Sequence, residues 1–213
     1  LALGMAFGAL ALLTAFIVGL WISLERPPLR TMGETRLWYS FFALLAGLLT
    51  YLKWRYRWIL SFSTVLATVF IVLNIARPEI HDQTLMPALQ SAWFIPHVTV
   101  YMFSYSLLGC AFILAVVGLL SRSQNVLPAA DTLIYIGTAF LTFGMLSGML
   151  WAKQAWGHYW GWDPKETWAL VTWLVYVLYI HLRVTGRGSR RMLCFLLIFG
   201  FACLQMCWWG INY

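Results

Sequence analysis

Seven long apolar runs dominate this chain and restrict the folds that it can adopt. A run of about 20 apolar residues crosses the hydrocarbon core of a bilayer as a helix, and a soluble domain does not repeat such runs. Hydrophobic residues make up 62% of the 213 residues, and the short alternating strands of an outer-membrane barrel are missing. We therefore expect an all-α fold, a polytopic transmembrane helical bundle. The predicted spans, of which the second is short and should borrow residues from its flanks, are 1–24, 37–52, 58–76, 97–120, 132–152, 164–184 and 192–209.

The charged residues between these spans indicate how the bundle faces. Alternate loops hold eight Lys or Arg against one acid on one side, and six against six on the other. Basic loops stay preferentially in the cytoplasm, which places 53–57 and 183–191 inside and 151–168 outside. Topology therefore explains the net charge of +7, and we expect a lipid membrane and no nucleic acid as a partner. We expect the bacterial inner membrane, with 151–168 on the periplasmic face, rather than the plastid thylakoid.

The segment 151–168, WAKQAWGHYWGWDPKETW, holds five of the 13 tryptophans. We expect a loop on the membrane surface that ends at a helix start, with Asp163 as N-cap, Pro164 at the first helical position and Glu166 completing a capping box. An aromatic belt that anchors the protein in the interface is the simpler explanation. Five tryptophans spaced by glycines exceed what anchoring requires, so the segment predicts a platform for a large planar apolar ligand.

Two other segments and the cysteines give weaker signals. Residues 77–96 predict a short amphipathic helix on the outer face, and Pro96 should close that loop just before the fourth span. The polar loop 25–36 gives no chemistry. The cysteines lie inside apolar runs without a CxxC pair, so we interpret them as small packing residues rather than redox or metal groups. The helix-spaced residues are Leu85, Met86, Leu89 and Trp93, and the cysteines are Cys110, Cys194, Cys203 and Cys207.

The four histidines differ in their predicted depth. His97 opens the fourth span at the depth of the tryptophan segment, and His181 lies 17 residues into the sixth span, on the order of 25 Å from its start. An ionisable group at that depth is a candidate functional residue, although a neutral histidine bonded to a neighbouring helix is the alternative. His81 is interpreted as a solvated loop residue, and the role of His158 is left open.

An aromatic platform with one imidazole at its edge and another deeper in the membrane fits haem. Haem is an apolar disc whose iron takes axial nitrogen ligands and whose propionates need cations or polar groups. Lys153 and Lys165 are candidates for the propionates, with solvated lysines as the alternative. The two histidines lie too far apart to hold one iron, so His97 and His181 would each need a partner from elsewhere.

The sequence WGHYWGWDPKETWALVTWLVYVLYIHLR resembles the tryptophan-rich (WWD) signature of the haem-handling membrane proteins of cytochrome c maturation. Its DPKETWA continuation is most similar to the CcsA (ResC) branch of the system II cytochrome c synthase, rather than to the CcmC and CcmF branches. The segment PALQSAWFIPHVTVYMFSYSLLG resembles the family's outer histidine region. The resemblance covers most of residues 85–213, and we divide the chain into N-terminal helices, 1–84, and a haem-handling core, 85–213.

The resemblance implies haem b as substrate and two axial ligands, His97 and His181, at separate stations. Haem would enter near His181 and reach the outer platform, where its vinyl groups form thioethers with the CxxCH motif of an apocytochrome c. The implied enzyme is a cytochrome c synthase, or haem lyase, that acts with a CcsB (ResB) half, which supplies the partner of His181. The second outer ligand would follow a further span after residue 213, so lyase activity of residues 1–213 alone is doubtful. The implied platform residues are Trp151, Trp156, Gly157, Tyr159, Trp160, Gly161, Trp162, Asp163 and Trp168.

Two other functions fit the same residues. A haem transporter or chaperone would pass haem on without forming a covalent bond. A structural or quinone-binding subunit would use the tryptophans as interface anchors and would carry no haem.

Overall fold

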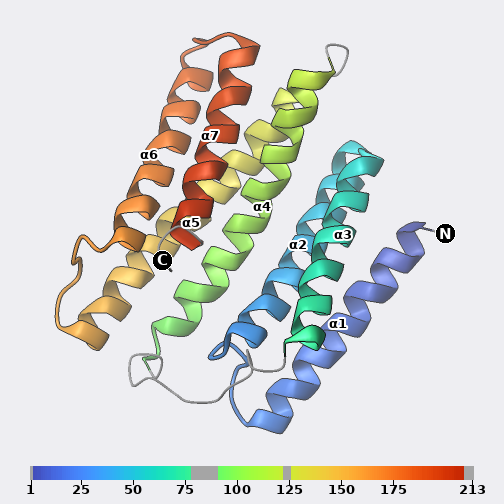
Figure 1. The fold of residues 1–213 in the computed structure, drawn as a ribbon. Coiled ribbons are helices and arrows are strands. Elements are labelled where there is room, and N and C mark those ends of the chain that lie inside the picture. Colours follow the sequence, from blue (N-terminus) through green and yellow to red (C-terminus); the bar gives the residue numbers. More distant parts are fainter. Residues whose placement is uncertain (1, 78–90, 122–125, 209–213) are drawn as a thin grey trace.

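A computed structural model describes residues 2–77, 91–121 and 126–208, which form seven helices and no strand (Figure 1). All seven are long and apolar enough to cross a membrane, so the expected all-α transmembrane bundle is confirmed. The helices are α1 (Ala2–Leu24), α2 (Met32–Trp54), α3 (Arg57–Ala76), α4 (Phe94–Leu120), α5 (Leu127–Trp156), α6 (Pro164–Val184) and α7 (Arg190–Trp208).

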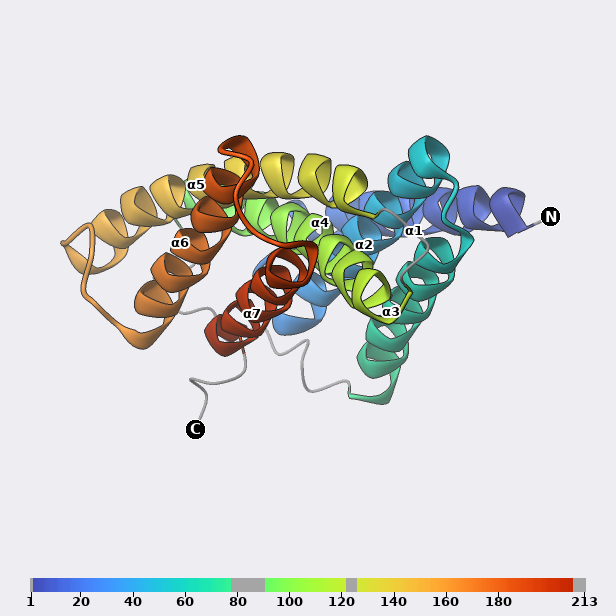
Figure 2. The ribbon, with the colours of Figure 1, turned by 90° about the horizontal axis from the view of Figure 1, so that it is seen from above.

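The helices form two groups that meet along α4. Helices α1, α2 and α3 lie on one side and α4 to α7 on the other (Figure 1, Figure 2). Consecutive helices pair as α2 with α3, α4 with α5 and α6 with α7, and α4 also packs against α2 and α7. The largest core cluster is centred on α4 and α5, where Leu108, Leu114, Ile134 and Leu141 are fully buried. Helix α4 therefore connects the two groups.

The loops alternate between the two ends of the bundle. The turns from α1 to α2 and from α5 to α6 lie at one end, and those from α2 to α3 and from α6 to α7 lie at the other (Figure 1). This agrees with the predicted alternation. We call the end that carries the α5–α6 turn the outer end, and its orientation in the membrane stays a prediction.

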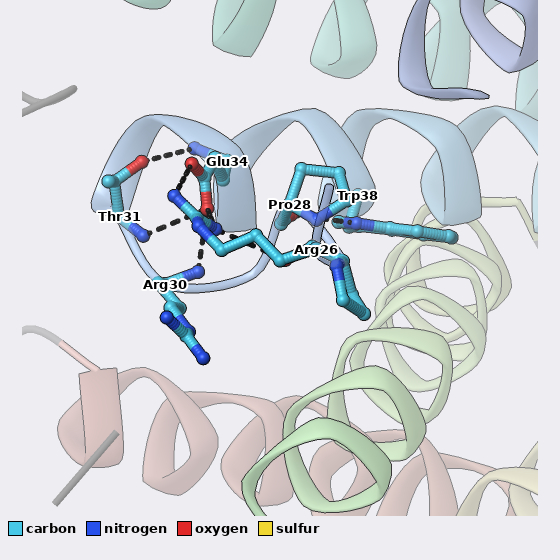
Figure 3. A network of polar contacts seen from close by, with 7 residues as sticks. Arg26, Pro28, Arg30, Thr31, Glu34 and Trp38 are labelled. Carbon is cyan, nitrogen blue, oxygen red and sulfur yellow. Dashed lines mark hydrogen bonds and ion pairs between the residues drawn. The ribbon is translucent and has the colours of Figure 1, made fainter. Parts of the chain in front are cut away.

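A polar network at the outer end starts α2 earlier than predicted (Figure 3). The Glu34 backbone N–H donates to the Thr31 hydroxyl at 3.1 Å, and the Glu34 carboxylate accepts from the backbone N–H groups of Thr31 and Arg30. The Arg26 guanidinium donates to both oxygens of Glu34, at 2.9 and 3.0 Å. This capping box satisfies the free N–H groups of the first turn and neutralises a buried carboxylate. Helix α2 therefore borrows residues 32–36 from its flank, as its short apolar run required.

Three predicted boundaries need correction or lie outside the described residues. Helix α5 continues to Trp156, so the predicted loop 151–168 is a loop only from Gly157 to Asp163. Helix α4 begins at Phe94, so Pro96 does not close a loop but sits in the first helical turn. A proline fits there because first-turn N–H groups have no intrahelical partner. Most of the expected amphipathic helix of 77–96, including Leu85, Met86 and Leu89, lies outside the described residues, as does His81.

Candidate functional site

The loop that joins α5 to α6 is held at its start by a left-handed glycine and a lysine. Gly157 ends α5 with φ of +84°, a conformation that glycine adopts without a steric penalty. The Lys153 ammonium donates to the Gly157 carbonyl at 2.8 Å and lies 5.3 Å from the centre of the Tyr159 ring. Lys153 therefore stabilises the loop itself, which makes it a weaker candidate for binding a ligand.

The end of the same loop is held by the predicted N-cap. The Glu166 backbone N–H donates to the Asp163 carboxylate at 2.8 Å, so Asp163 caps α6 as expected. The predicted capping box is only half formed, because the Glu166 carboxylate accepts from the backbone N–H of Gly161 at 2.7 Å instead. Glu166 thereby ties the tryptophan-rich loop to the first turn of α6. Both ends of a seven-residue loop are fixed.

A cavity of about 580 Å³ lies beneath this loop, between α4, α5, α6 and the end of α7. Its volume falls within the range of small-molecule and cofactor sites. Aromatic side chains make much of its wall, and Lys165 and Glu166 bring charge to its edge. The predicted site residues that line it are His97, Trp151, Trp156, Tyr159, Trp160, Asp163 and Lys165.

His97 lines this cavity, and one of its ring nitrogens is bonded to the neighbouring helix. Its Nδ1 lies 2.8 Å from the Gly144 carbonyl oxygen. Because a carbonyl only accepts hydrogen bonds, Nδ1 carries the proton in the neutral ring and Nε2 keeps its lone pair. The ring stacks on Trp151 at 5.5 Å and 18°, and meets the edge of Tyr101 at 4.6 Å and 73°. A histidine whose second nitrogen is bonded to a carbonyl is typical of metal and haem ligands.

Trp160 contributes a second polar atom that lacks a protein partner. Its indole Nε1 is buried, and no hydrogen-bond acceptor meets it among the described residues. Trp160 lines the cavity, and its ring meets Trp162 edge to face at 5.7 Å. An unpaired buried N–H is unfavourable, so this donor is a candidate contact for a ligand that supplies an acceptor.

The other predicted site residues are not among those that line the cavity. Gly157 and Gly161 shape the loop, Trp162 is 68% exposed, and Lys153 is engaged with the loop backbone. Trp168 lies in the first turns of α6, partly buried. The seven lining residues come from α4, α5, the loop and α6, and the structure brings them together around one space, whereas these five are not part of its lining.

His181 lies at the opposite end of the bundle from His97. It is in the last turn of α6, whose first residues line the cavity, and its side chain is exposed. Two residues away on either side, Tyr179 and Arg183 both donate to the carboxylate of Asp131 on α5. Within the described ranges, no three His, Cys, Asp or Glu side chains cluster as a metal site. The two histidines therefore lie at opposite ends of the bundle, as their sequence positions indicated.

Several cavity residues were missed by the sequence analysis. The signal that could have found two of them is a spacing of four on α4, which places Tyr101 and Tyr105 below His97 on one helix face. Cys207, interpreted as a packing residue, lies in the cavity wall with its thiol 3.8 Å from the Lys165 carbonyl oxygen. The missed lining residues that carry no sequence signal are Met145, Gly148, Met149, Ala152, Ala169 and Cys207.

Comparison with known proteins shows the family of this chain. A family model described as "Cytochrome C assembly protein" matches residues 29–213. The "Cytochrome c biogenesis protein CcsA" of Guillardia theta is 31% identical over 230 residues, covering 91% of this chain and 76% of the relative. The protein of the same name from Mesostigma viride is 32% identical, covering 97% and 83%. That of Chlamydomonas reinhardtii is 36% identical over 162 residues, and this chain spans only 46% of its length.

The family match covers the cavity, both histidines and six of the seven helices, and the relatives share one name. The chain therefore belongs to the cytochrome c assembly protein family, as a CcsA-type multi-pass membrane protein with a role in cytochrome c biogenesis.

Proposed function

We propose that this chain carries haem across the membrane and presents it in the outer cavity for thioether attachment to the CxxCH motif of an apocytochrome c. The observation that carries this proposal is the His97 ring, which lines an aromatic cavity and whose Nδ1 is bonded to a carbonyl, so that Nε2 keeps its lone pair. Haem is a substrate here and not a resident cofactor. His181 is the proposed station at which haem enters.

The residues around the cavity fit haem in three respects. His97 Nε2 offers the axial nitrogen that iron takes. Trp151, Trp156 and Tyr159 offer apolar faces that replace water on a flat macrocycle. Trp160 Nε1 and the Lys165 ammonium offer a neutral and a charged donor for propionate carboxylates. Lys165 is a better candidate than Lys153, because Lys153 already donates to the Gly157 carbonyl.

In the proposed reaction the chain supplies position and exclusion of water. Each thioether forms when a cysteine S–H adds across a haem vinyl group, so the thiol sulfur bonds to carbon and the proton ends on the other vinyl carbon. The thiols come from the apocytochrome. His97 fixes the macrocycle by its iron, and the aromatic walls hold the plane. The Asp163 carboxylate is occupied as the N-cap of α6, which leaves it a structural role.

Two further groups are needed to complete this function. Among the described residues, His97 is the one imidazole that lines the cavity, so a second outer ligand would come from another part of the protein or from the CxxCH histidine. His181 is exposed, and no cluster of three His, Cys, Asp or Glu side chains lies among the described residues, so its partner is proposed to be the CcsB half. Lyase activity is therefore proposed for the assembled synthase.

The membrane is proposed to be the bacterial inner membrane or the plastid thylakoid membrane. The named relatives come from Guillardia theta, Mesostigma viride and Chlamydomonas reinhardtii, all of which have plastids. They do not favour the bacterial membrane that we expected from the sequence. In both membranes the cavity faces the side on which cytochromes c are assembled.

Haem delivery without covalent chemistry is the second candidate. It is favoured by the cavity wall, where Asp163 acts as a helix cap and Glu166 binds a backbone N–H, so neither is an obvious general base. The two functions differ in what the assembled protein does to an apocytochrome.

The test is to purify the full-length protein with its CcsB half, record oxidised and reduced absorption spectra, and co-express a CxxCH apocytochrome. We expect six-coordinate haem that is lost or altered in His97→Ala and His181→Ala and restored in His97→Ala by added imidazole. His158→Ala serves as control, because His158 is exposed and does not line the cavity.

Covalent haem on the apocytochrome would support the synthase, and bound haem with no covalent product would support delivery alone. A haem spectrum that does not change in His97→Ala would contradict the assignment of His97 as the outer axial ligand. Protein without any haem would contradict both candidates.

A further inference from the structure

The imidazole of His97 occupies a slot between α4 and α5 that closes on Gly148. A Cβ atom built on Gly148 would lie 2.6 Å from Cε1 and 2.7 Å from Nδ1 of His97. These distances are far below the van der Waals contact of two heavy atoms. The ring therefore fills the space that any larger side chain at position 148 would need.

Three other groups complete the slot. The Gly144 carbonyl oxygen accepts from Nδ1, Trp151 stacks on one face of the ring, and the edge of Tyr101 closes another side. Gly144 and Gly148 are one helical turn apart on α5, and Trp151 follows three residues later, so the three share one face of that helix. The ring is thus held by contacts in its plane and on its face, and Nε2 is the nitrogen left for the cavity.

A glycine in this place opposes the local preference of the helix. Position 148 is inside the 30-residue helix α5, where glycine is less favourable than alanine. Close packing of helices explains such glycines in general, and at Gly144 a Cβ would indeed lie 2.9 Å from the Tyr101 ring. At Gly148 the side chain that packs against the glycine is the imidazole ring of His97, the candidate iron ligand.

We propose that Gly148 is a positioning residue for the iron ligand His97: its missing side chain lets the ring lie where Nδ1 meets the Gly144 carbonyl and Nε2 faces the cavity. A methyl group on a helix backbone cannot rotate away. It would displace the ring, break the bond from Nδ1 and move Nε2 from its place. The inference rests on the proposed role of His97 and adds to it the residue that sets the direction of the ligating nitrogen.

The test compares Gly148→Ala with His97→Ala and with the double variant, each in the full-length protein with its CcsB half. Haem retention and the reduction potential are measured with and without added imidazole. We expect Gly148→Ala to weaken haem binding about 10- to 100-fold, as is usual when the support of a ligand is lost. Because the double variant has no ring at position 97, its alanine methyl has room, and added imidazole should restore haem as fully as in His97→Ala.

The matched control is Gly109→Ala on α4, where the new Cβ would lie 3.6 Å from the Phe201 ring, an ordinary contact. This control should retain haem with an unchanged potential. Normal haem binding by Gly148→Ala would overturn the proposal. An equal loss of haem binding in the double variant with added imidazole would also overturn it, because the alanine methyl would then disturb the cavity itself and not the position of the His97 ring.

The double variant also decides the case in which Gly148→Ala fails to fold. Recovery of folded, imidazole-dependent haem protein on adding His97→Ala would show that the clash is with the ring, whereas failure of both would refute this. Failure of the proposed function would give a different result, because His97→Ala would then bind haem as the wild-type protein does. The positioning role would fall with it.

Discussion

The two histidine stations differ in how much of their surroundings this chain supplies. His97 is enclosed by α4 and α5, bonded to a backbone carbonyl and stacked on a tryptophan. His181 is exposed on α6, and the polar groups beside it, Tyr179 and Arg183, are both engaged with Asp131. The proposed outer station at His97 is thus preorganised within one chain, whereas the proposed inner station at His181 presents an exposed side chain for a partner to meet.

This difference follows from how α6 packs. Its fully buried residues, Thr172, Tyr176 and Tyr179, share one face that contacts the rest of the bundle. His181 is two residues beyond Tyr179, a rotation of about 200° around the helix. It therefore lies on the opposite face, where Leu174 and Leu178 are also exposed. An exposed imidazole on such a face is consistent with a partner helix in the proposed synthase.

The largest effect is expected when the wall of the outer station is removed by Trp151→Ala. The indole contacts Phe94, His97 and Trp156 with ring centres 4.7 to 5.6 Å apart. Each aromatic pair contributes roughly 0.5–1.5 kcal/mol beyond the area it buries, so a loss of a few kcal/mol and of most bound haem is expected. Thermal unfolding in detergent and the haem spectrum measure the two effects.

Trp162→Ala is the matched control, because Trp162 is 68% exposed and has one aromatic neighbour, Trp160. If Trp151→Ala and Trp162→Ala lower the stability and the haem content equally, the packing of Trp151 around His97 does not make the proposed outer station preorganised.

The next effect is expected at the inner end, from Asp131→Ala. Its carboxylate accepts from the Arg183 guanidinium and from the Tyr179 hydroxyl, which ties α5 to α6 beside His181. Hydrogen bonds to charged groups contribute roughly 1.5–3 kcal/mol, and their loss should lower the free energy of unfolding by a similar amount. Asp131→Asn keeps one acceptor oxygen and should lose less. Equal losses for the two variants, measured by thermal unfolding, would argue against the carboxylate as the tie.

The sequence predicted the helices better than it predicted the site. Apolar runs predict all seven spans, because a hydrophobic segment inside a bilayer must satisfy its own backbone hydrogen bonds and does so as a helix. The helical state of residues 153–156 was missed, since Lys153, Gln154 and Trp156 at an interface resemble a loop in composition. The Thr31–Glu34 capping box was also readable but was not recognised.

The missed parts of the site depend on contacts between distant residues. His97 and Gly144 are 47 positions apart, and no local sequence pattern predicts that the carbonyl of Gly144 bonds to the ring of His97 on another helix. The platform tryptophans could be named from their clustering. Which of them face the cavity depends on the left-handed turn at Gly157 and on the bond from Gly161 to Glu166.

A smaller effect is expected from Asp163→Ala at the join between the loop and α6. The N-cap carboxylate satisfies the Glu166 N–H, and replacing such a residue by alanine costs about 1 kcal/mol. Asp163→Asn is the control, since asparagine caps nearly as well, and it should retain both stability and haem. If asparagine fails as badly as alanine, the negative charge at the cavity edge matters and the capping role does not suffice.

The smallest effect on the chain by itself is expected from His181→Ala. The side chain is exposed and donates no hydrogen bond within the described residues, so the unfolding midpoint of the chain without its partner should not shift measurably. In the assembled synthase the same change should stop haem from reaching the outer cavity, while haem supplied from the outer side should still bind at His97. A stability loss in the chain alone would mean that His181 packs within this bundle. Delivery that persists in the assembled protein would mean that haem does not pass the exposed face of α6.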